Sequence, residues 1–156
     1  MKNKDNKFRS LYKRALTPGI DKLLIQATRD LERAVVDDPC GMIDDLDDFV
    51  TKCQDMSCHP SRVRSLSRIL WLYVSQTPIK PKRELQKKIV TQAIHWSWTY
   101  NQTAIICYCT KIVAEYQLDF WELFTMHRDY IMYEQPNQSS GVQSIIRNYL
   151  IFNPFI

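Results

Sequence analysis

The sequence predicts an all-α protein, folded as a single-domain bundle of about six to seven helices. Apolar residues recur at the 3.6-residue spacing of helices along most of the 156-residue chain, and no segment forms a convincing strand pattern. Only three glycines are present, which is few for a sheet protein with many tight turns. Hydrophobic residues make up 45% of the chain, which is enough to build one core.

The chain begins with a polar, basic segment. Residues 1–16 hold six lysines and arginines against one aspartate and show little periodicity, so we expect a flexible basic tail before a helical domain over 17–156. Thr17 and Pro18 supply an N-cap and a proline at the first helical position. The first helix should end just before Pro39, because a residue that precedes a proline is pushed out of the α region.

Two further helices are expected over about 40–56 and 61–76. The first places apolar residues on one face and aspartates on the other, and this acidic face consists of Asp44, Asp45, Asp47 and Asp48. The second begins at a Ser61 cap after Pro60. Arginines close to its start are disfavoured by the helix dipole, which indicates that they serve a partner instead of the helix.

Pro81 opens a fourth expected helix. A fifth, over about 103–117, is apolar on most sides, which is typical of a helix at the centre of a bundle. A sixth should begin at Asp119 with a pattern that resembles a capping box. After a break at 135–141, a short last helix is expected over about 142–151.

No motif for catalysis is present. Three isolated glycines cannot form a phosphate-binding loop, and successive aspartates of a helix point in different directions. Ordinary packing explains His95 and His127, because neither has a carboxylate and a nucleophile at a readable spacing. The sequence therefore predicts a protein that is not an enzyme and needs no cofactor, with an enzyme of unrecognised type as an alternative.

The five cysteines occur at irregular spacing in a chain with no stretch of 18 apolar residues, and its polar first residues lead us to expect no secretory signal. We therefore expect an intracellular protein with free thiols. A small zinc-binding domain is an alternative, whose candidate ligands are Cys40, Cys53, Cys58 and His59. These residues lack the CxxC knuckle of most structural zinc sites. Cys107 and Cys109 are interpreted as core residues, because they lie on the most apolar helix.

Two features indicate binding to another macromolecule. The first is a basic block within residues 61–88, whose members are Arg62, Arg64, Arg68, Lys80, Lys82, Arg83, Lys87 and Lys88. Such a block suits an acidic protein surface, RNA phosphates or simple solvation. The second is an aromatic cluster, whose members are Trp96, Trp98, Tyr100, Trp121 and Tyr133. Its first three members, spaced i, i+2 and i+4, cannot all face one core, so an interface anchor or loop packing is expected.

Four segments carry a resemblance to a known family. They are Arg29-Asp30-Leu31-Glu32-Arg33-Ala34, Pro39-Cys-Gly-Met-Ile-Asp-Asp-Leu-Asp-Asp-Phe, Ile69-Leu-Trp-Leu-Tyr-Val and Thr103-Ala-Ile-Ile-Cys-Tyr-Cys-Thr-Lys-Ile-Val. Over about residues 20–130 this pattern resembles the C accessory proteins of paramyxoviruses, of the morbillivirus and henipavirus kind. The N-terminal segment departs from the morbillivirus proteins because it is much shorter, so signals borne by their tails are not carried over.

The resemblance implies a non-structural, non-enzymatic regulatory adaptor in the cytoplasm of the host cell. Such proteins restrain viral RNA synthesis through the polymerase and phosphoprotein complex, antagonise the interferon response of host innate immunity, and in some members recruit ESCRT components during budding. The family has no known catalytic residues. The sequence Lys80-Pro-Lys-Arg fits a nuclear import element or a helix start. The alternative function is an RNA-binding protein that uses residues 61–88.

Overall fold

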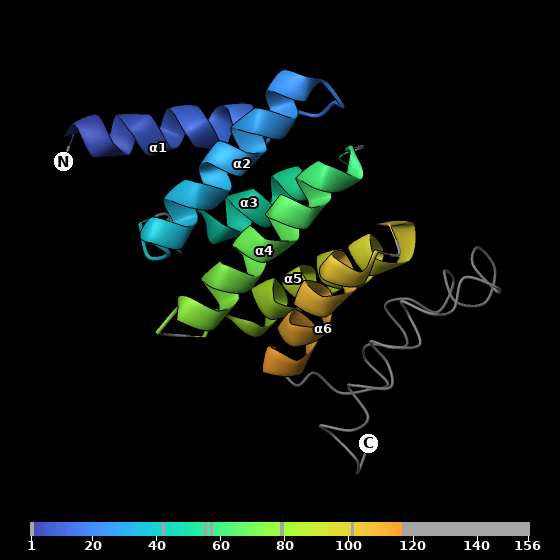
Figure 1. Cartoon of the computed structure of the whole chain (residues 1–156). Coiled ribbons are helices and arrows are strands. Elements are labelled where there is room, and N and C mark those ends of the chain that lie inside the picture. Colours follow the sequence, from blue (N-terminus) through green and yellow to red (C-terminus); the bar gives the residue numbers. More distant parts are fainter. Residues whose placement is uncertain are drawn as a thin grey trace, which may run out of the picture. The chain divides into compact units, whose positions relative to one another are not determined.

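The computed structural model of the chain is all-α, as the sequence predicts (Figure 1). It describes residues 2–41, 43–54, 56, 58–78, 80–100 and 102–116. These residues form six α-helices and one short 3-10 helix, and their sole β feature is an isolated bridge between Gly19 and Cys58. The helices expected from Asp119 onward lie outside the described residues. None of the described helices combines the length and apolar character that crossing a membrane requires.

The chain divides into two compact units, residues 1–80 (unit 1) and 81–156 (unit 2). The elements of unit 1 are α1 (Lys2–Ala15), α2 (Lys22–Asp37), η1 (Ile43–Asp45), α3 (Leu46–Cys53) and α4 (Pro60–Gln76). Helix α2 contacts both α1 and α4. Helices α2 and α4 lie side by side and run in the same direction (Figure 1). The fully buried side chains between these elements include Leu31, Val35, Phe49, Leu66, Ile69 and Leu70.

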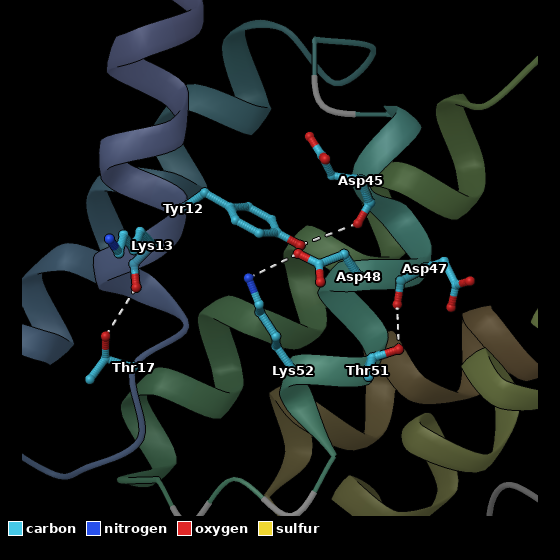
Figure 2. A network of polar contacts seen from close by, with 8 residues as sticks. All are labelled: Tyr12, Lys13, Thr17, Asp45, Asp47, Asp48, Thr51 and Lys52. Carbon is cyan, nitrogen blue, oxygen red and sulfur yellow. Dashed lines mark hydrogen bonds and ion pairs between the residues drawn. The ribbon is translucent and has the colours of Figure 1, made fainter.

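The expectation of a flexible tail over residues 1–16 is wrong. Lys2–Ala15 form α1, which buries Phe8, Tyr12 and Ala15. The Tyr12 ring packs against Phe49 with their centroids 6.3 Å apart, and its hydroxyl donates a hydrogen bond to the Asp45 carbonyl oxygen at 3.2 Å (Figure 2). The buried residues follow a helical spacing of four and three, but this narrow stripe is hidden among six basic residues.

The entry into α2 also differs from the expectation. Asp21, and not Thr17, is the N-cap, and its carboxylate accepts a hydrogen bond from the Leu23 backbone N–H at 2.6 Å. Thr17 instead donates its hydroxyl to the Lys13 carbonyl oxygen at 3.0 Å, at the end of α1 (Figure 2). Between them Gly19 has a φ of +142°, a conformation that side chains disfavour. The chain can therefore turn sharply from α1 into α2.

Helix α3 and the preceding η1 carry the acidic face that the sequence predicts. Asp44, Asp47 and Asp48 are exposed, while Phe49 and Cys53 on the other side of the helix are buried. An ion pair joins Lys52 Nζ to Asp48 Oδ2 at 3.0 Å (Figure 2). The acidic face is thus a solvated surface stabilised by an i, i+4 pair, which contributes about 0.3–0.5 kcal/mol.

The N-cap of α4 is His59, two residues before the expected Ser61. The His59 Nδ1 atom accepts a hydrogen bond from the Ser61 backbone N–H at 3.1 Å. Pro60 occupies the first helical position, where the absence of an N–H removes no helical bond. Because its ring nitrogen is engaged in this cap, His59 has a structural role.

The described part of unit 2 is a pair of contacting helices, α5 (Arg83–Tyr100) and α6 (Thr103–Tyr116). Their buried apolar residues include Ile89, Ala93, Ile105, Ile112 and Val113. The interpretation of both cysteines of α6 as core residues is half wrong, since Cys109 is buried and Cys107 is exposed. Side chains two positions apart on a helix diverge by about 200°, so only one of them can face the core.

Candidate functional site

A groove with a volume of about 380 Å³ lies between α2 and α4 in unit 1. Its lining consists of Arg29, Glu32, Arg33, Val36 and Asp37 from α2, and of Arg64, Ser65 and Arg68 from α4. Half of these residues are arginines. We call this feature the arginine groove.

The helical repeat and the direction of the two helices place these arginines. Arg29 and Arg33 are four residues apart on α2, and Arg64 and Arg68 are four residues apart on α4, so each pair shares one helix face. The two helices run in parallel, because their contacts occur in the same order along both: Arg62 donates a hydrogen bond to Thr28, and further along Arg68 pairs with Glu32. The two arginine pairs therefore form two rows along the walls of one groove.

The arginine groove has an excess of positive charge, with four guanidinium groups against two carboxylates. Arg68 Nη1 lies 3.4 Å from Glu32 Oε1, and the Glu32 side chain is only 12% exposed. Arg29, Arg33 and Arg64 are exposed, and their side chains make no ion pair with any residue that the structure describes. Three cationic groups on one concave surface are thus available to an anionic ligand. Guanidinium groups bind carboxylate and phosphate oxygens through paired N–H donors.

Arg62, which the sequence placed in the partner-binding block, is fully buried with 0% exposure. Its Nε donates to Thr28 Oγ1 at 3.0 Å, its Nη1 to the Gly19 carbonyl oxygen at 2.7 Å, and its Nη2 to the Ala15 carbonyl oxygen at 2.6 Å. Ala15 is the last residue of α1, where the helix dipole is negative. Arg62 therefore joins α1, the turn at Gly19 and α2 to α4, and cannot contact a partner.

Arg62 lies near the start of α4, an unfavourable position for a cation, and its partners are residues of the same chain. The helix dipole disfavours a cation at this position. The direction of the side chain, which decides between an internal and an external partner, depends on which helix packs over it. That packing could not be read from the sequence.

Cys53 and Cys58 are buried beside this arginine. Burial raises the pKa of both thiols, and the positive charge of Arg62 lowers the pKa by a smaller amount. The thiols are therefore protonated at neutral pH and are poor nucleophiles. Within the described part of the chain, no group of three or more His, Cys, Asp or Glu side chains is placed to hold a metal ion.

The rest of the basic block is divided between the two units. Arg64, Arg68 and Lys80 belong to unit 1, and only the first two line the arginine groove. The members in unit 2 are Lys82, Arg83, Lys87 and Lys88. Lys82 and Arg83 are exposed, whereas Lys87 pairs with Glu84 at 3.7 Å and Lys88 is half-buried. The residues of the basic block therefore do not share one surface within either unit.

The aromatic cluster is not confirmed as an exposed anchor. Trp96 is buried, with 2% exposure, which corrects its assignment to a partner-binding surface. Its burial follows from its place on the apolar face of α5, beside Ala93 and Ile89 in the helical repeat. Trp121 and the side chain of Trp98 lie outside the described residues.

Sequence reasoning missed Arg29 and Arg33 as site residues. They lie in the stretch 21–55, where ten acidic residues outnumber four basic ones, so the segment reads as acidic. Their i, i+4 spacing was a usable signal, because it gathers two cations on one helix face. The pairing of this face with α4 was not readable.

No protein-family model, curated protein or solved structure matches the chain.

Proposed function

We propose that this protein is a non-catalytic adaptor that binds an acidic protein partner through the arginine groove. The observation that carries the proposal is the group formed by Arg29, Arg33 and Arg64, whose exposed guanidinium groups have no ion-pair partner among the described residues. Exposed charges that stabilise nothing in the folded chain are available to steer and orient a partner of opposite charge.

The lining of the groove favours a protein partner over RNA. Single-stranded RNA is usually bound by aromatic side chains on which bases stack, and no aromatic residue lines the groove. The carboxylates of Glu32 and Asp37 also repel a continuous row of phosphates. A polypeptide can avoid this repulsion because its acidic side chains need only lie opposite the arginines.

The resemblance to paramyxovirus C proteins supplies the biological setting of the proposal. We propose that the acidic partner belongs to the viral polymerase and phosphoprotein complex in the host cytoplasm, and that docking lowers viral RNA synthesis. Interferon antagonism and recruitment of ESCRT components are the other roles that the resemblance implies. Each of them is also a role of binding and not of catalysis.

A reconstituted viral polymerase reporter tests this proposal. The groove variant carries Arg29→Glu, Arg33→Glu and Arg64→Glu, and the control variant carries Arg9→Glu, Arg14→Glu and Lys22→Glu. Both change the net charge equally at exposed positions, where each substitution alters stability by about 0.5 kcal/mol or less. We expect the wild type and the control variant to lower reporter RNA with increasing dose, and the groove variant to lose this effect.

Circular dichroism and thermal melting must show that both variants are folded. A folded groove variant that still represses would remove the arginine groove as the docking surface. A wild type that does not repress would instead remove the role in RNA synthesis.

A further inference from the structure

We infer that the arginine groove binds an extended polypeptide segment with carboxylates at alternate positions. This inference rests on the proposed function, because it specifies the ligand of the same groove.

The spacing of the arginines matches that of alternate residues in an extended chain. Arg29 and Arg33 are four residues apart, as are Arg64 and Arg68, which places the members of each pair about 6 Å apart along their helices. Alternate side chains of a β-strand are about 6.6 Å apart and point to the same face. An extended peptide that runs along the groove can therefore present consecutive carboxylates of one face to consecutive arginines.

The parallel arrangement of α2 and α4 extends this match to both walls. The two helices run in the same direction (Figure 1). The interval between arginines therefore repeats in the same direction along both walls of the groove. A carboxylate can then lie between Arg64 of α4 and a guanidinium of α2, whereas Arg68 already pairs with Glu32. Two cations around one carboxylate suit its two oxygens and roughly four acceptor sites.

The length of the groove suits a short extended segment. From Arg29 to Asp37, α2 rises by about 12 Å, which is the length of about four residues of an extended chain. Such a segment can therefore contact the lining along the whole groove.

Two further residues favour a peptide ligand with a limited number of charges. Val36 is 41% exposed and lines the groove one turn after Arg33, where it can contact an apolar atom of the ligand. Glu32 holds the guanidinium of Arg68 at 3.4 Å and adds a negative charge beside it. Carboxylates spaced by uncharged residues meet the arginines without crowding this glutamate.

Fluorescence anisotropy at low salt tests the inference with two labelled nine-residue peptides of identical composition. The alternating peptide is Glu-Ser-Glu-Ser-Glu-Ser-Ser-Ser-Ser, and the triplet peptide is Glu-Ser-Ser-Glu-Ser-Ser-Glu-Ser-Ser. In the triplet peptide, consecutive carboxylates are about 10 Å apart and on opposite faces of an extended chain. We expect the wild type to bind the alternating peptide roughly tenfold more tightly than the triplet peptide. This ratio corresponds to one additional contact between a carboxylate and an arginine, worth about 1.4 kcal/mol.

The groove variant and the control variant of the reporter assay serve here as well, together with a nine-nucleotide oligouridylate. The control variant should bind like the wild type, and the groove variant should lose the preference and most of the affinity. Equal affinity of the wild type for both peptides, abolished in the groove variant, would overturn the alternating ligand but leave an acidic partner in place. Tighter binding of the oligouridylate through the groove would overturn both. Failure of every probe to bind would overturn the inference, while the reporter assay decides on the function separately.

Discussion

Replacing Arg62 with alanine should destabilise the protein far more than replacing Arg64, although the two arginines are only two positions apart on α4. Arg62 has no exposed surface and donates hydrogen bonds to Ala15, Gly19 and Thr28. Arg64 is exposed, and its side chain bonds to no described residue. The two substitutions remove the same chemical group and the same charge, so Arg64→Ala is a matched control.

The expected magnitude follows from the three hydrogen bonds of the guanidinium. Each hydrogen bond that involves a charged group contributes about 1.5–3 kcal/mol to stability. Part of this contribution is offset, because the unfolded state keeps the cation hydrated and the folded state does not. Arg62→Ala leaves three oxygen acceptors without their donor, each at a cost of about 1–3 kcal/mol, and we expect a total loss of about 3–5 kcal/mol. A typical domain has only about 5–15 kcal/mol of stability.

Urea unfolding, followed by far-ultraviolet circular dichroism, measures these differences. The Arg64→Ala variant should lie within about 0.5 kcal/mol of the wild type. An Arg62→Lys variant should be intermediate, because an ammonium group keeps the charge but lacks the planar fork of donors that reaches three oxygens. Equal unfolding midpoints for Arg62→Ala and Arg64→Ala would refute the structural role of Arg62.

Two other predictions concern buried groups. Tyr12→Phe should lower the free energy of unfolding by about 1 kcal/mol, because it removes the hydrogen bond to Asp45. Tyr73→Phe should be neutral or stabilising, because the Tyr73 hydroxyl is buried with no hydrogen-bond partner among the described residues. Urea unfolding checks the pair, and an equal cost for both would contradict it. The second prediction is that stability falls as the pH rises above about 9, the ordinary pKa of a thiol. Burial raises the pKa of thiols and phenols in the folded state, so the unfolded state loses these protons first as the pH rises. Each such group then lowers the free energy of unfolding by up to about 1.4 kcal/mol per pH unit. These groups are Cys53, Cys58, Cys109, Tyr12, Tyr73 and Tyr116. An unfolding free energy that is flat from pH 8 to 11 would contradict this prediction.

The helical class was predictable because the periodicity of apolar residues is a local property. Local signals also predict where α2 ends and where α4 begins. Helix α2 ends at Asp37, just before Pro39, and α4 begins at Pro60. Helix α1 was not predicted, because only Phe8, Tyr12 and Ala15 form its apolar stripe. Its stability comes from contacts with residues such as Phe49, more than thirty positions away, which local periodicity cannot reveal.

The candidate site was less predictable than the fold, because a charge count along the sequence sums over all faces of a helix. By this count, Arg62 belonged to a basic block, and Arg29 and Arg33 belonged to an acidic segment. The structure reverses both assignments: Arg62 is internal, and the other two line a basic groove. A groove exists only where two helix faces meet, so the pairing of α2 with α4 had to be known before its charge could be counted.

Arg62 also connects the stability of the fold to the shape of the arginine groove. Its hydrogen bond to Thr28 ties α4 to α2, the two helices whose faces form the groove, and Thr28 directly precedes Arg29. Reversing the charge of Arg62 would place a carboxylate against three oxygens that now accept hydrogen bonds, and would separate these helices. Loss of repression in a variant that combines this reversal with changes to Arg64 and Arg68 would therefore reflect damage to the fold. Only substitutions on the exposed rows of the groove, with Arg62 kept, can separate binding from folding.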